Sequence, residues 1–169
     1  MTDLYAAEPS AFWDPTPKAR PTPGRHDIIL LDSCIWIYLF EDHPQYAPLI
    51  DTMLRQWARE SASLISSELS LVEIKTVPLR HGDESIAVEY QLYLNNFPGF
   101  FLMPIERAIL NHAARLRARY RFKTPDAIII ATGLERGATL AVTNDLAWRN
   151  LIEIEVLCLA DLPEGRATR

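Results

Sequence analysis

Short apolar runs that alternate with longer amphipathic segments are the feature that most constrains the fold of this chain. Each run is two to four residues long, which is consistent with a short strand buried on both faces. We expect strands at residues 28–31, 64–65, 100–103, 140–142 and 156–159. Strands that alternate with helices form a parallel sheet covered on both sides, so the chain is predicted to be an α/β protein.

The segments between these runs carry helical periodicity and start signals. Helices are expected from Ser33, from Pro44, after a cap at Ser66 or Ser67, over 84–96, over 104–120, and from a cap at Thr124 to about Arg136. Pro125 in the first turn and Gly137 after the last turn favour the same limits for the last of these helices.

The length of 169 residues suits one domain. Residues 1–25 hold five of the 12 prolines and show no regular periodicity, which predicts a flexible or extended arm. Residues 26–163 are expected to form the domain, and residues 164–169 a short tail.

The composition excludes several classes of protein. Cys34 and Cys158 match no disulfide or zinc spacing, and the four histidines show no metal-binding pair. No apolar run is long enough to span a membrane, and no signal peptide is evident at the N-terminus. We therefore expect a cytoplasmic protein with two reduced thiols and no membrane association.

Acidic residues follow the predicted strands. Asp32 ends the first, Glu73 lies in the helix after the second, Asp126 precedes the fourth and Asp145 follows it; Glu68 is a weaker candidate at a helix entrance. Ligands of open parallel sheets bind at the carboxyl ends of the strands, where these acids are expected to meet. Taken singly, Asp32 and Asp145 are also consistent with helix caps, Asp126 with a favourable helix dipole, and Glu73 with a surface position.

The conjunction of acids is harder to explain by capping. Several carboxylates at one edge repel one another unless a cation neutralises them. Oxygen ligands without histidine or cysteine favour Mg²⁺ or Mn²⁺. Such ions can activate water and hold a phosphate for hydrolysis.

At this point the sequence resembles a known family. The resemblance rests on four segments that cover the chain from about Asp27 to Leu162: Leu31-Asp32-Ser33-Cys34-Ile35-Trp36-Ile37, Ile65-Ser66-Ser67-Glu68-Leu69-Ser70-Leu71-Val72-Glu73-Ile74, Lys123-Thr124-Pro125-Asp126-Ala127-Ile128-Ile129-Ile130-Ala131-Thr132 and Val142-Thr143-Asn144-Asp145. In order, spacing and residue type they resemble the motifs of PIN-domain ribonucleases, and more narrowly of VapC-type toxins of toxin–antitoxin pairs.

The resemblance implies a three-layer α/β/α fold around a central parallel sheet, and RNA hydrolysis that depends on Mg²⁺ or Mn²⁺. Carried over by position, the catalytic acids are Asp32, Glu73, Asp126 and Asp145, with Asp32 and Asp126 as metal ligands. Ser33, Thr143 and Asn144 match supporting positions. Cys34 departs from the family, which often has asparagine there. The resemblance also implies a protein antitoxin as partner and a homodimer.

RNA requires positive charge near the acids, although the chain as a whole has a net charge of −5. Residues 104–123 hold six basic residues against Glu106, a local charge of +5. Arg115, Arg119, Arg121 and Lys123 are the candidate RNA contacts; a solvated face that pairs with acids elsewhere is the alternative. Trp148 suits either base stacking or the core.

The leading hypothesis is therefore a metal-dependent endoribonuclease, the toxin of a toxin–antitoxin pair. The alternatives are a non-catalytic PIN-fold module that binds RNA or protein, and a PIN nuclease that processes RNA without an antitoxin. A dehalogenase-type phosphatase is disfavoured, because Cys34 stands where that chemistry needs a second aspartate.

Overall fold

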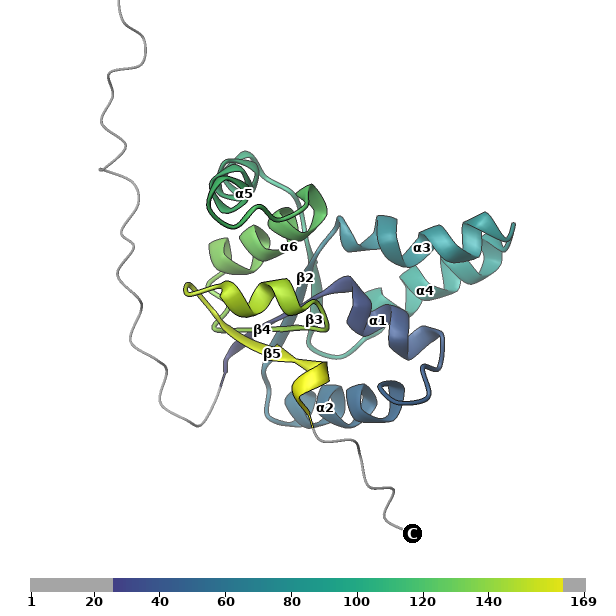
Figure 1. The fold of residues 1–169 in the computed structure, drawn as a ribbon. Helices are drawn as coiled ribbons and strands as arrows, with labels where there is room; N and C mark the ends of the chain where they lie inside the picture. The colour runs from purple at the N-terminus through teal and green to yellow at the C-terminus, as the bar shows by residue number, and fades with distance from the viewer. Residues whose placement is uncertain (1–25, 163–169) are drawn as a thin grey trace, which may run out of the picture.

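A computed structural model describes residues 26–162, and Figure 1 shows a parallel sheet between two sets of helices. The strands are β1 (Ile28–Leu31), β2 (Ser63–Ser67), β3 (Phe100–Met103), β4 (Leu140–Thr143) and β5 (Glu155–Cys158). The helices are α1 (Ser33–Phe40), α2 (Ala47–Arg59), α3 (Ser70–Arg80), α4 (Glu84–Asn96), α5 (Arg107–Tyr120) and α6 (Thr124–Glu135), with short 3₁₀ helices η2 (Leu146–Asn150) and η3 (Leu159–Asp161). The predicted arm and tail lie outside the described residues.

The sheet has the strand order β3-β2-β1-β4-β5, and all of its neighbouring strands run parallel. The side chains of the central strand β1 alternate between the two faces of the sheet, as in any β-strand. Leu30 packs with residues of α5 and α6, whereas Ile29 and Leu31 pack with residues of α1 and α2. The predicted three-layer α/β/α architecture is thereby confirmed, with one core on each face of the sheet (Figure 1).

Trp148 belongs to the core. Its side chain in η2 has no exposed surface, and it packs in the cluster that α5 and α6 form with the sheet. The core interpretation of this residue is confirmed, and base stacking by Trp148 is wrong.

Two helices on the α1 side begin later than the sequence predicts. Helix α2 begins at Ala47 with a proline in its first turn, and not at Pro44. Helix α3 begins at Ser70, because Ser66 and Ser67 continue strand β2. The prediction of a serine cap at those positions is wrong, since their backbone bonds are used by the sheet partners in β3.

The two helices on the other face also differ at their starts. Helix α5 begins at Arg107, three residues after Pro104. In α6, Lys123 occupies the cap position and Thr124 is already helical, so the predicted Thr124 cap is wrong by one residue. Gly137 follows α6 with φ of 76°, a left-handed conformation that ends the helix as predicted. Within the described part of the chain, no helix is both long and apolar enough to cross a bilayer.

Gly133 in α6 lies against β1 with no room for a side chain. A Cβ atom there would stand 2.6 Å from Cδ2 and 3.1 Å from Cβ of Leu30. We expect Gly133→Ala to lower the free energy of unfolding by roughly 1–3 kcal/mol, because overpacking outweighs the gain of about 1 kcal/mol in helix propensity. Urea unfolding with an unchanged m-value measures this loss.

The matching double variant locates the cause. Leu30→Val removes the Cδ2 atom of the closest contact, so the two substitutions together should cost less than the sum of their separate costs. Additive costs, or a stabilised Gly133→Ala variant, would show that the close approach of α6 to β1 is not the constraint.

Candidate functional site

The candidate site lies where the strand order of the sheet reverses, between β1 and β4. From β1 the chain first adds β2 and β3 on one side, and later places β4 and β5 on the other. In open α/β sheets, ligands bind in the crevice beyond the carboxyl ends of the two strands at such a reversal, which here are β1 and β4. Asp32 follows β1 and Thr143 ends β4, and the backbone N–H of Asp32 donates to the carbonyl of Val142 at 3.0 Å.

Asp32 is buried at this point and accepts hydrogen bonds from two neighbouring side chains. The hydroxyl of Thr143 and the thiol of Cys34 approach its Oδ2 atom at 2.5 Å and 3.3 Å. Asp32 occupies the N-cap position of α1, as the local alternative predicted, but its side chain makes no capping hydrogen bond to the helix. Burial raises the pKa of Asp32 above its usual value, although the hydrogen bonds from Thr143 and Cys34 oppose the rise.

Ser33 joins Asp32 to Glu73, which comes from helix α3. The Ser33 hydroxyl donates to Oε2 of Glu73 at 2.5 Å, and its oxygen lies 3.3 Å from Oδ1 of Asp32. Glu73 is half-buried, so the surface interpretation of this residue is not supported. A side chain that follows β1 thus fixes an acid that is 40 residues away in the sequence.

Asp126 lies in the first turn of α6 and faces the other acids. Loss of solvent raises the pKa of its carboxyl to about 6, with further contributions from the charges of Asp32, Asp145 and Glu73; the charge of Lys123 lowers it. Because the charges of all three other carboxylates act on Asp126, the four predicted acids lie near one another at one edge of the sheet. Glu68, the weaker candidate, is exposed and is not among the groups that affect Asp126.

Asp145 has two roles in the geometry. Its carboxylate accepts a hydrogen bond from the N–H of Ala147 at 2.8 Å, so it caps η2 as the local alternative predicted. Its own N–H donates to the Thr143 hydroxyl oxygen at 3.0 Å, and that hydroxyl in turn donates to Asp32. Thr143 therefore fixes Asp32 relative to the segment that carries Asp145.

The donor set suits a hard divalent cation that keeps part of its water shell. All four acids have carboxylate oxygens that can act as metal ligands, and the repulsion between their charges favours the binding of a cation. Across residues 26–162, no three His, Cys, Asp or Glu side chains already form a closed metal-binding group. Mg²⁺ commonly binds through one or two carboxylates plus waters and substrate phosphate, so it needs no such closed group.

Cys34 takes the place of a neutral hydrogen-bond donor. Burial raises the pKa of its thiol, and the nearby charge of Asp32 raises it further, so the sulfur stays protonated. The thiol then donates to Asp32. The departure from asparagine at this position preserves a donor toward the acid.

The predicted RNA-binding residues divide into two groups. Arg119 is paired with Glu153 at 2.9 Å and lies over the ring of Tyr120, in agreement with the alternative of a solvated, paired face. Arg115, Arg121 and Lys123 are exposed. Lys123 precedes α6 and acts on the charge of Asp126, so positive potential does reach the acids from this side.

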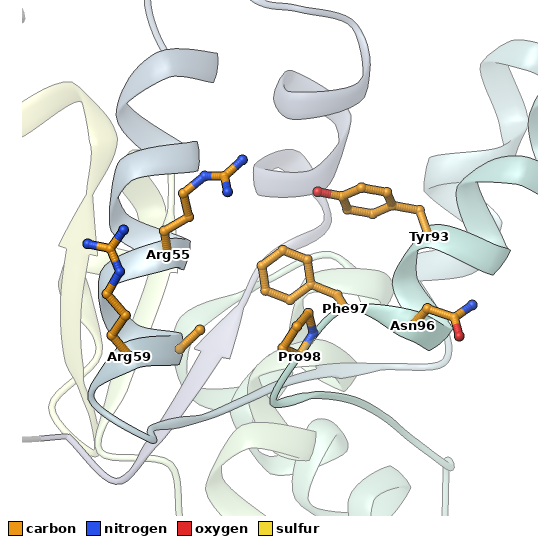
Figure 2. A pocket seen from close by; sticks show the side chains of 7 residues that line it. Arg55, Arg59, Tyr93, Asn96, Phe97 and Pro98 are labelled. Atoms are coloured by element: carbon orange, nitrogen blue, oxygen red, sulfur yellow. The ribbon is translucent and has the colours of Figure 1, made fainter.

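A cavity of about 390 Å³ lies away from the acids, between α2 and α4. Figure 2 shows Arg55 and Arg59 of α2 on one side, with Tyr93 and Phe97 on the other. None of the predicted site residues lines it.

The comparisons with known proteins agree with this geometry. A family model described as PIN domain matches residues 29–153. No curated protein matches the sequence.

Several solved structures share the fold. VapBC2 from Rickettsia felis bound to a DNA fragment from its promoter is 15% identical, with 78% of this chain and 98% of that chain covered and a TM-score of 0.64. DNA-bound VapBC from Salmonella typhimurium is 14% identical over 79% of this chain and 98% of that chain, with a TM-score of 0.61. VapC20 from Mycobacterium tuberculosis, a toxin that cleaves the sarcin-ricin loop, is 17% identical over 68% of this chain and 86% of that chain, with a TM-score of 0.54.

Proposed function

This chain belongs to the PIN domain family, and on that premise we propose that it is a divalent-metal-dependent endoribonuclease that acts as the toxin of a toxin–antitoxin pair. The observation that carries the proposal is the convergence of Asp32, Glu73, Asp126 and Asp145 beyond the carboxyl ends of β1 and β4, where the strand order of the sheet reverses. A binding module without catalysis has no need to place four mutually repelling acids at the ligand-binding edge of its sheet.

Asp32 and Asp126 are the residues that would hold the cation, Mg²⁺ or Mn²⁺. When bound, the cation neutralises phosphate charge and activates water for attack on the phosphodiester. Glu73 and Asp145 contribute directly or through ordered water. The reaction is a hydrolysis: a water oxygen bonds to phosphorus, the bond from phosphorus to one ribose oxygen breaks, and that oxygen leaves with a proton.

The hydroxyl groups of the chain hold the acids in position. Ser33 orients Glu73, and Thr143 orients Asp32 while it accepts the N–H of Asp145. Asn144 lies between Thr143 and Asp145 and supports the same loop. Because these bonds are made before any substrate arrives, little reorganisation is needed when RNA binds.

Arg115, Arg121 and Lys123 are the basic residues proposed to contact RNA phosphate. Lys123 is the one whose charge acts on the acid site itself. Arg119 is a weaker candidate for contact with RNA, because an approaching phosphate would compete with Glu153 for its guanidinium.

An antitoxin protein is the proposed partner, since the solved structures that share the fold include a toxin–antitoxin complex from Klebsiella pneumoniae. A homodimer in the cytoplasm is also proposed. The apolar side chains of Val88 and Leu92 on α4 are more than half exposed, which supports burial against another chain. Light scattering of the purified protein measures the oligomeric state.

The direct test is cleavage of RNA by the purified full-length chain. We expect cleavage with Mg²⁺ or Mn²⁺ and none after chelation by EDTA, because water activation and phosphate neutralisation both depend on the ion. Gel analysis of end-labelled RNA measures the products. Recovery of the activity when Mn²⁺ is added back is the control for irreversible damage by the chelator.

The same experiment separates the alternatives. RNA that binds tightly but stays intact with every divalent cation would favour the non-catalytic module. Metal-dependent cleavage would favour a nuclease of RNA processing if, in the host, no partner protein inhibits the chain.

A further inference from the structure

Three aromatic side chains lie together beside the acids: Tyr38 in α1, and His43 and Tyr46 in the connection to α2. Their ring centroids are 4.7 Å apart for Tyr38 and His43, 5.2 Å for Tyr38 and Tyr46, and 4.8 Å for His43 and Tyr46. All three side chains are half-buried, so each keeps some surface open to solvent. We refer to these three residues as the aromatic cluster.

The aromatic cluster is tied directly to the acid edge. Asn144, which lies between Thr143 and Asp145, donates from Nδ2 to the hydroxyl of Tyr38 at 3.2 Å. Tyr38 is also four residues after Cys34, so both lie on the same face of α1, and Cys34 contacts Asp32. The helical rise places Tyr38 about 9 Å further along α1 than Asp32.

The local backbone holds these rings in place. His43 Nδ1 accepts the backbone N–H groups of Gln45 and Tyr46, each at 3.3 Å, which fixes the imidazole at the entrance to α2. The rings of Tyr38 and Tyr46 stack at an interplanar angle of 24°. A rigid aromatic surface loses little conformational entropy when a further ring stacks on it.

Charge near the aromatic cluster decides which part of RNA it accepts. Glu41 and Asp42, in the turn between α1 and His43, are exposed acids that repel phosphate. A nucleobase has no such charge, and unpaired bases stack on tyrosine and histidine rings. The backbone phosphates would then lie on the side of Lys123 and the cation.

We propose that the aromatic cluster is a nucleobase subsite that stacks an unpaired base next to the scissile phosphate. The inference rests on the proposed nuclease function and extends it, because it assigns the residues that hold one unpaired base beside the cleaved bond. Trp148, the aromatic residue that the sequence offered for stacking, is buried and is not available for this role.

The test is a double-mutant cycle between one ring and one base, measured on the full-length chain. The substrate is a single-stranded RNA that the chain cleaves at one bond, made intact and with a single abasic nucleotide at each position around that bond. With the wild-type chain, one abasic position should lower kcat/KM by about 5- to 150-fold, the usual worth of one stacked base.

Tyr38→Leu should lower kcat/KM on intact RNA by a similar factor, and the abasic nucleotide should then cause no further loss. Tyr38→Phe keeps the ring and should keep the abasic penalty. Tyr90→Leu is the matched control, because Tyr90 is also half-buried and stacks on a ring of α1, that of Phe40 at 4.2 Å. This variant should keep the wild-type rate and the full penalty.

An abasic penalty that persists at full size in Tyr38→Leu overturns the inference and assigns the rings to packing alone. It leaves the nuclease function standing, whereas a chain that cleaves no RNA with any divalent cation overturns both.

Thermal unfolding of each variant checks that it folds. If Tyr38→Leu does not fold, wild-type protein is photo-crosslinked to RNA with iodouridine at the sensitive position. A crosslink to the aromatic cluster supports the subsite, and crosslinks confined to other residues overturn it.

Discussion

Asp126→Asn is expected to abolish RNA cleavage, with a fall in kcat on the order of 10³-fold or more. The substitution keeps the size of the side chain and removes the charge that we propose holds the cation. Loss of the several kcal/mol that a metal ion supplies to the transition state corresponds to a rate loss of this order. Single-turnover cleavage of end-labelled RNA with saturating Mn²⁺ measures it.

Glu68→Gln is the matched control for this prediction. It removes one carboxylate at the same edge of the sheet, but Glu68 is exposed and lies outside the group that acts on Asp126. We expect near-normal cleavage from this variant. Equal losses in the two variants would show that general negative charge matters and not the position of Asp126, and wild-type activity in Asp126→Asn would contradict the site assignment.

Without metal, the stability of the folded chain is expected to fall as the pH rises, whereas the stabilisation by divalent metal is expected to grow as the pH rises. Without metal, the pKa of Asp126 is raised from 3.8 to about 6 in the folded chain, so the folded state holds this proton more tightly than the unfolded state. Its contribution to stability is therefore present at low pH and is lost as the pH rises from about 4 through about 6. Asp32, whose pKa is also raised, acts in the same direction.

Divalent metal should reverse this trend, because it binds the ionised carboxylates. At a concentration of Mn²⁺ one hundred times its Kd, the stabilisation is about 2.7 kcal/mol, or about 5–10 °C in Tm for a chain of this size. We expect the Mn²⁺-induced rise in Tm to be larger at about pH 7.5 than at about pH 4.5. Differential scanning fluorimetry with Mn²⁺ or with EDTA measures both effects.

Asp126→Asn serves here as the control. The metal-free variant should be more stable than wild type at about pH 7.5, since the neutral amide avoids the charge repulsion, and the difference should shrink at about pH 4.5. It should also show little stabilisation by Mn²⁺. A wild-type Tm that does not respond to Mn²⁺ at either pH would contradict a metal site among these acids.

The strands could be predicted from the sequence because short apolar runs mark them. The runs at residues 28–31 and 100–103 coincide with the central strand β1, which is largely buried, and with the edge strand β3, where Phe101 stays 53% exposed. Helix starts were less predictable. Ser66 and Ser67 look like caps in isolation, but pairing with β3 keeps them in β2.

The candidate acids could also be listed from the sequence, since each follows or precedes an apolar run. Their contacts could not. The bond from Ser33 to Glu73 and the bond from Thr143 to Asp32 join residues 40 and 111 positions apart. No local pattern encodes such pairs, because they depend on which strands become neighbours.

Tyr38 shows the same limit for an aromatic residue. In the sequence it is one more apolar position of α1, and Trp148 was the aromatic residue noted for stacking. In the structure Trp148 fills the core, the second of the two roles left open for it, and Tyr38 contacts Asn144 beside the acids.

The sequence by itself determined the class of fold, the approximate places of the strands and the four candidate acids near them, because burial and turn chemistry act over a few residues. Only the tertiary structure decided that β4 lies beside β1, which brings Asp32 next to the segment of Thr143 and Asp145. It also decided which arginines are paired and which rings border the acids. Those outcomes depend on the summed packing of the sheet and its helices, which no single segment of the sequence specifies.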